Sequence, residues 1–137
     1  AIAEGGRAML YYAGKFADFM SVGILEGDEK KRLYWDDKLG FFTPILKGFL
    51  TELGCECANL GMQVFGGHGY VKEHGMEQIV RDTRIALIYE GTSAIQALDL
   101  LGRKIMGSGG ELLRGFAAIV EQFCAEVATA ETAALGA

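Results

Sequence analysis

A long run of apolar residues at helical spacing constrains this chain more than any other feature. From Phe42 to Val64 the apolar positions follow one another at intervals of four, three, four, four, three and four residues. This near-heptad rhythm places their side chains on one face of a long helix, as in helices that pack antiparallel in a bundle. The positions are Phe42, Leu46, Phe49, Leu53, Cys57, Leu60 and Val64.

The start of this helix has two readings because of Pro44, the only proline in the chain. Thr43 can cap the helix with Pro44 at its first position, where a missing N–H costs nothing. Alternatively the helix begins near Asp36 or Asp37 and kinks at the proline. The sequence alone does not decide between them.

Four further stretches have helical spacing, and no stretch alternates as a strand would. They are residues 9–20, 78–87, 93–107 and 111–127. Thr92 or Ser93 is a good N-cap for the third, and Gly107 to Gly110 read as a flexible linker before the fourth. We therefore predict an all-α fold, an up-and-down helical bundle.

Composition excludes several classes of protein. Asp and Glu number 18 against 13 Lys and Arg, so the formal charge of -5 argues against nucleic acid as a partner. No apolar run approaches the ~20 residues of a membrane span, and no leader pattern is present, so we expect an intracellular protein with no membrane partner. The three cysteines, Cys55, Cys57 and Cys124, are predicted to be free thiols and not metal ligands.

Three glycines in four positions end the long helix. Gly66, Gly67 and Gly69 lie in the stretch 63–70, where they can form a helix C-cap with a tight turn. The alternative is that they expose backbone amides beside a phosphate. The glycines follow a helix and not a strand, which excludes a dinucleotide-binding fingerprint. The role of His68 stays open, and His74 is expected at the surface.

A cluster of charges follows this loop. Arg81, Asp82 and Arg84 precede a very apolar segment, and we expect ion pairs to tie this short helix to its neighbours. The alternative is that the two arginines meet a phosphate.

Glu90 is the most suggestive single residue. It follows five apolar residues and precedes a glycine and a helix start. Apolar surroundings favour the protonated carboxyl, whereas a helix N-terminus favours the carboxylate, a combination that can tune a general base. The simpler alternative is a helix-start glutamate favoured by the helix dipole.

Taken together, three stretches resemble one family. Gln63 to Tyr70, then Arg81-Asp82, then Ile88 to Gln96 are similar, without a gap, to the C-terminal helical domain of acyl-CoA dehydrogenases. The resemblance covers Ala1 to about Gly107 and implies two parts, 1–107 as that domain and 108–137 as an extension helix and tail. It also implies a fragment that lacks the first helix of the domain. The extension resembles the larger bacterial branch, which includes 3-methylmercaptopropionyl-CoA dehydrogenase-like proteins.

The resemblance assigns roles to particular residues. Glu90 matches the base that removes the α-proton of an acyl-CoA thioester while the β-hydride passes to FAD. Gly91 matches a position beside the substrate thioester. Two stretches match contacts to FAD. The first consists of Thr92, Ser93 and Ala94. The second matches a contact to the ADP part of an FAD that a neighbouring subunit mainly binds, and consists of Gln63, Val64, Phe65, Gly66 and Gly67. Ala94 stands where a polar residue is common, which removes one side-chain contact.

The resemblance further implies an FAD-dependent oxidoreductase of fatty acid metabolism that forms a homodimer or tetramer. Its electron acceptor would be electron-transfer flavoprotein or a similar protein. Its location would be the bacterial cytoplasm, or the mitochondrial matrix in a eukaryote. We expect the isolated segment to be inactive, because a site built by several domains cannot be preorganised by one of them. The rivals are an acyl-CoA oxidase of the same fold and a non-catalytic helical assembly module.

Overall fold

The protein is described by a computed structural model that covers residues 2–135, with side chains placed for residues 2–127. Within these residues every element is a helix and none is a strand, so the all-α prediction is confirmed. The α-helices are α1 (Ile2–Glu26), α2 (Glu29–Phe65), α3 (Gly67–Tyr70), α4 (Met76–Arg84), α5 (Ser93–Leu98) and α6 (Glu111–Leu135). Between them lie two 3₁₀ turns, η1 (Lys72–His74) and η2 (Ile85–Leu87), and the π-helical segment η3 (Asp99–Met106).

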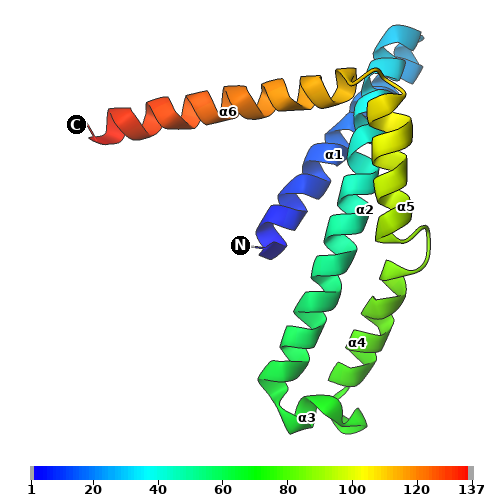
Figure 1. Cartoon of the computed structure of the whole chain (residues 1–137), viewed down its shortest axis with the longest axis vertical. Coiled ribbons are helices and arrows are strands. Elements are labelled where there is room, and N and C mark those ends of the chain that lie inside the picture. Colours follow the sequence, from blue (N-terminus) through cyan, green and yellow to red (C-terminus); the bar gives the residue numbers. More distant parts are fainter. Residues whose placement is uncertain (1, 136–137) are drawn as a thin grey trace.

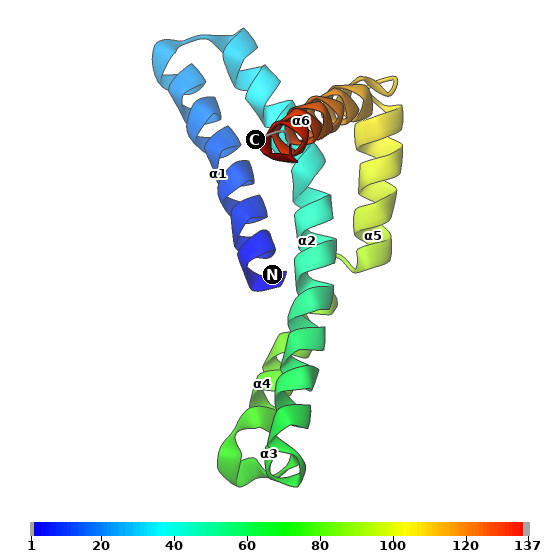
Figure 2. The ribbon, with the colours of Figure 1, turned by 90° about the vertical axis from the view of Figure 1, so that its left-hand side faces the viewer.

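Helix α2, with 37 residues, is long enough for α1, α4 and α5 all to pack along it, and we call it the spine. Figures 1 and 2 show α1 returning along one part of α2, while α4 and α5 lie along it elsewhere. All three run antiparallel to α2, as the up-and-down topology predicts. Helix α3 closes the far end of the spine, and α6 projects away from the other helices (Figure 1).

The spine begins earlier than either reading of Pro44 predicts. Asp28 caps it, accepting a hydrogen bond from the backbone N–H of Lys31 at 3.0 Å. The helix then runs on through Pro44, which is buried inside it. The predictions of a start at Thr43 or near Asp36 are both wrong, because Asp28 caps the helix and Trp35 and Leu39 continue the apolar spacing of Phe42 toward the N-terminus.

The predicted helix over 78–87 is present as α4 followed by the tighter turn η2. The predicted helix over 93–107 is present as α5, which widens into η3 before the linker. Thr92 does occupy the N-cap position, with extended backbone at φ -66 and ψ 167, but its side chain makes no capping hydrogen bond.

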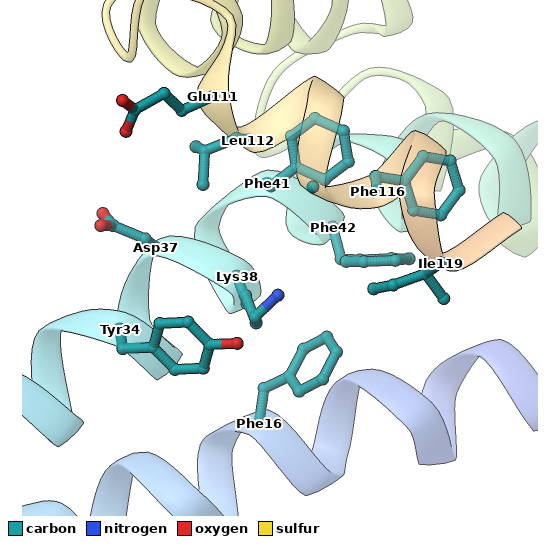
Figure 3. Close-up of a pocket in the computed structure, with 11 residues that line it drawn as sticks. Phe16, Tyr34, Asp37, Lys38, Phe41, Phe42, Glu111, Leu112, Phe116 and Ile119 are labelled. Carbon is teal, nitrogen blue, oxygen red and sulfur yellow. The ribbon is translucent and has the colours of Figure 1, made fainter. Parts of the chain in front are cut away.

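Aromatic rings join α1, α2 and the start of α6. Phe16 and Phe41 are 5% and 4% exposed and form the centre of the cluster. Phe16 stacks on Trp35 at 5.6 Å between ring centroids, and Phe116 lies 5.5 Å from Phe42. Figure 3 shows Phe16, Phe41, Phe42 and Phe116 around a cavity, which has a volume of about 330 Å³. The first turns of α6 are thereby fixed to the spine.

Away from this cluster, the described part of the chain has only a small hydrophobic core. Its buried apolar residues are few, and no large side chain in it is completely buried. Large apolar side chains are exposed on every one of the six α-helices, with Leu25 and Val64 both 86% exposed. Large apolar side chains exposed in such number are typical of helices that contact other protein. No helix over the described residues has the length and hydropathy that crossing a bilayer requires.

Candidate functional site

The turn between η2 and α5 carries Glu90 and lies beside the middle of α2, where it joins two helices that both run antiparallel to α2 (Figure 1). Glu90 has φ 56 and Gly91 has φ 92, so two successive residues adopt left-handed backbone. Glu90 is the only residue other than glycine with positive φ among those described. Such a conformation costs a glutamate about 1–3 kcal/mol and persists only where surrounding contacts impose it.

Side chains from two helices impose this conformation. The ammonium of Lys47, on α2, donates to the carbonyl oxygens of Ala86 at 3.0 Å and Gly91 at 2.5 Å. The amide of Gln96, on α5, donates to the carbonyl oxygen of Glu90 at 3.0 Å. All three acceptors are backbone atoms, so the path of the turn is fixed while the Glu90 carboxylate is left exposed.

Gly91 is required here by both its conformation and its surroundings. A Cβ atom at this position would lie 2.9 Å from Nε2 of Gln96 and 3.2 Å from Cγ2 of Ile95. A side chain at Gly91 would therefore displace Gln96, the residue that holds the Glu90 carbonyl.

The start of α5 is attached to α2 by a separate contact. The hydroxyl of Ser93 donates to Oε1 of Glu52 at 2.8 Å, which occupies the Ser93 side chain within the chain. Thr92 and Ala94 on either side are exposed. This segment can therefore offer a ligand its backbone and the Thr92 hydroxyl, but not the Ser93 side chain without breaking that bond.

The structure separates the roles of the three loop glycines. Gly66 has φ 59 and its N–H bonds to the carbonyl of Gln63 at 3.0 Å, which is a helix cap. At Gly69 a Cβ would lie 2.5 Å from the carbonyl oxygen of Met62, so this glycine is needed for close packing. At Gly67 nothing lies within 4 Å of the Cβ position, so nothing in the described chain requires a glycine there.

The other members of this stretch face outward. Gln63 is exposed, and Val64 and Phe65 are 86% and 51% exposed at the last turn of α2. His68 and His74 are also exposed, with ring centroids 5.2 Å apart. His74 thus lies at the surface as predicted.

The two predicted contact stretches do not come together in this chain. Residues 63–67 lie at the far end of the spine, whereas the turn with Glu90 lies beside its middle, and α4 fills the length between them (Figure 1). A single ligand held by this chain alone would not reach both. The Glu90 side chain is exposed within this chain, so the partly apolar surroundings expected for it stay a prediction.

The charges of α4 pair differently from the prediction. Arg81 lies 3.5 Å from Glu77, and Gln78 donates to Asp82 at 2.7 Å, both within α4. No ion pair among the described side chains links this helix to a neighbour, so that prediction is wrong. Arg81 and Arg84 instead line an open groove between α2 and α4. Its other lining residues are Cys55, Asn59, Met62, Tyr70, Lys72, Glu77 and Val80.

Perturbed ionisation lies elsewhere, on the helix surfaces. The Arg32 guanidinium, hydrogen-bonded to Glu29, lowers the pKa of that carboxyl. In the same way Arg103 lowers the pKa of Asp99.

The three cysteines are free, and no group of three His, Cys, Asp or Glu side chains converges on a metal position in the part of the chain described.

Sequence reasoning missed Lys47 and Gln96 as residues of this site. Lys47 does stand out as a cation one residue after the apolar position Leu46, but nothing in the sequence says what it contacts. Its two acceptors lie 39 and 44 residues away along the chain.

Comparison with known proteins identifies the family. Residues 2–106 match the family described as acyl-CoA dehydrogenase, C-terminal domain. The chain is 44% identical over 120 residues to 3-methylmercaptopropionyl-CoA dehydrogenase of Ruegeria pomeroyi, covering 88% of this chain and 20% of the relative. It is 33% identical over 124 residues to the broad-specificity linear acyl-CoA dehydrogenase FadE5 of Mycobacterium tuberculosis, covering 90% of this chain and 20% of the relative.

A butyryl-CoA dehydrogenase of Syntrophomonas wolfei is 29% identical over 133 residues, 97% of this chain and 21% of the relative. A match of that length must include residues of α6, beyond the family's C-terminal domain. The chain spans about a fifth of the length of these relatives. On the helical architecture and the match over residues 2–106, the chain belongs to the acyl-CoA dehydrogenase family, whose C-terminal domain it contains.

Proposed function

We propose that this chain is the C-terminal helical part of a larger FAD-dependent acyl-CoA dehydrogenase subunit. In this proposal residues 1–107 are the family's C-terminal domain without its first helix, and 108–137 are an extension helix and tail. The relatives named as acyl-CoA dehydrogenases, each about five times as long as the matched part, support it. The reaction is the α,β-dehydrogenation of an acyl-CoA thioester.

Glu90 is the proposed catalytic base, and the geometry of its turn is the single observation that carries the proposal. An α-proton of a thioester is weakly acidic, so its base must be held within hydrogen-bonding reach. The backbone of Glu90 is fixed at φ 56 by contacts from α2 and α5, while its carboxylate is exposed. A rigid turn with a free carboxylate is suited to this task.

The proton balance of the step is simple. The Glu90 carboxylate takes the α-proton, the electrons of that C–H bond become the second bond between the α- and β-carbons, and hydride leaves the β-carbon. Bound FAD would supply the acceptor for that hydride. Gly91 lies next to the base and would present its backbone to the thioester.

Residues of this chain fit contact with FAD at two places. Thr92 and Ala94 are exposed beside the base, and the Ser93 backbone lies between them. Gly67 has open space where a side chain would stand, and Gln63 to Gly66 leading to it are exposed. Because the two places lie apart along α2, we propose that they contact two different FAD molecules, one of them held mainly by a neighbouring subunit.

The exposed apolar faces support assembly with other domains and subunits. A chain with so few buried side chains among those described leaves large areas to be covered. We propose a homodimer or tetramer, in the bacterial cytoplasm, that passes electrons to electron-transfer flavoprotein or a similar acceptor. The isolated chain would be inactive because it leaves Glu90 exposed.

An anaerobic titration of the complete subunit tests the proposal. Adding octanoyl-CoA without oxygen should bleach the absorbance of bound flavin. Glu90→Gln should retain the flavin and fail to bleach, whereas the control Glu56→Gln, at an exposed position of α2, should behave as wild type. Bleaching by Glu90→Gln at the wild-type rate would refute the base assignment. A complete protein without flavin would refute the enzyme and leave the helical assembly module.

A further inference from the structure

We propose that Lys47 is a positioning residue for the base, holding the turn that presents Glu90 to substrate. This inference rests on the proposed function of Glu90. Its ammonium bridges the carbonyl oxygens of Ala86 and Gly91, which lie on opposite sides of Glu90 in the chain. One side chain therefore fixes both ends of the segment that carries the carboxylate.

The bond pattern of Lys47 separates it from an ordinary surface lysine. The side chain is half-buried, and among the described residues no carboxylate pairs with it. Two of its three N–H donors instead meet backbone carbonyls. Hydrogen bonds from a charged donor are stronger than neutral ones, and more so away from bulk water.

Lys47 is itself on a rigid element. It lies in the middle of α2, one residue after the buried Leu46, and the Thr51 hydroxyl bonds its backbone carbonyl at 2.7 Å. Among the described residues, only one other side-chain hydrogen bond joins this segment to the spine, between Ser93 and Glu52. Gln96 acts from α5 and moves with the turn. The position of Glu90 relative to α2 therefore depends chiefly on Lys47.

Removal of the ammonium should let the turn relax without unfolding the domain. The left-handed conformation at Glu90 would keep the Gln96 bond but lose the two Lys47 bonds that tie it to α2, and the carboxylate would shift relative to bound substrate. A misplacement of about 1 Å at a reacting group lowers the rate by about 100-fold.

The experiment compares three variants of the complete subunit. Lys47→Met keeps the apolar stem and removes the charge, whereas Lys47→Arg keeps a charged donor. The control Lys38→Met removes a half-buried lysine elsewhere on α2, whose ammonium lies over the Tyr34 ring. We expect Lys47→Met to retain flavin, to lower kcat by about 100-fold with little change in KM, and to increase the isotope effect of an α-deuterated substrate. Lys47→Arg should recover part of the loss, and Lys38→Met should match wild type.

Hydrogen exchange of the amides in residues 86–91 supplies a readout that does not depend on catalysis. Faster exchange there in Lys47→Met, together with the kcat loss, supports the inference. Unchanged exchange, or faster exchange with unchanged kcat, overturns it. Wild-type turnover by Glu90→Gln overturns the proposed function instead, and separates that failure from a failure at Lys47.

Discussion

Two glycines in one loop should respond with opposite sign to the same substitution. A methyl group at Gly69 would lie 2.5 Å from the carbonyl oxygen of Met62 and 2.8 Å from Cβ of Phe65, whereas ordinary contact begins at 3.4 Å. The overlap with the carbonyl oxygen is 3.4 - 2.5 = 0.9 Å, and a backbone atom cannot rotate away. At Gly67 the same methyl would meet nothing within 4 Å.

The magnitudes follow from this difference. Overpacking of a tight site costs about 1–3 kcal/mol, and the helix preference of alanine offsets up to about 1 kcal/mol of it. Gly69→Ala should therefore destabilise the loop by about 1–2 kcal/mol. Gly67→Ala should stabilise it by about 0.5–1 kcal/mol, because alanine loses less conformational freedom on folding.

Hydrogen exchange of amides in residues 62–70 of the flavin-free complete subunit measures both effects. Gly69→Ala should raise these exchange rates by about 5- to 30-fold, and Gly67→Ala should lower them. Equal rates in the two variants would refute the division of roles. Gly67→Val should separately reduce the flavin content of the holoenzyme, since its side chain would occupy the space assigned to FAD.

Two further predictions concern packing and pH. Phe16→Ala removes a ring that is 5% exposed and whose centroid lies 4.8 Å from that of Tyr12 and 5.6 Å from that of Trp35. The loss should destabilise the packing of α1 on α2 by about 3–5 kcal/mol. Amide hydrogen exchange throughout α1 should become faster. Arg103 lowers the pKa of Asp99 from its usual 3.8, so this pair stabilises η3 above pH 3.8 and the stabilisation is lost as the pH falls through the lowered pKa. The difference in thermal unfolding between wild type and Asp99→Asn should therefore shrink on acidification, and a difference that persists well below that pH would contradict the assignment.

Periodicity predicted the helices well because apolar spacing reports which face of a helix is buried. It located the spine at Phe42 to Val64 but missed its first turns, since residues 29–41 are held by the Asp28 cap and by aromatic contacts with α1. Periodicity also cannot tell an α-helix from the π-helical turns of η3, which differ only in the hydrogen bonding of the backbone.

The sequence predicts which residues form the site, but not which side chains hold them in position. Glycine at 91 indicates a turn, but the left-handed conformation of Glu90 depends on Lys47, whose contacts cross 39 and 44 residues of sequence. The glycine pattern at 66–69 left a cap and a ligand contact as alternatives, and only the surroundings of each Cβ position separate the roles of these glycines. No described residue buries the Glu90 side chain, so the apolar surroundings expected for it would have to come from other parts of the complete subunit.

Exchange of the α-proton of a substrate analogue with solvent tests the central claim, that Glu90 is the base, most directly. An acyl-CoA with sulfur in place of the β-carbon has no β-hydride to lose, so the complete holoenzyme can only remove and return its α-proton. In D₂O the wild-type protein and Glu56→Gln should introduce deuterium at the α-carbon, and Glu90→Gln should not, although it binds the analogue. Exchange by Glu90→Gln at the wild-type rate would contradict the assignment of Glu90 as the base.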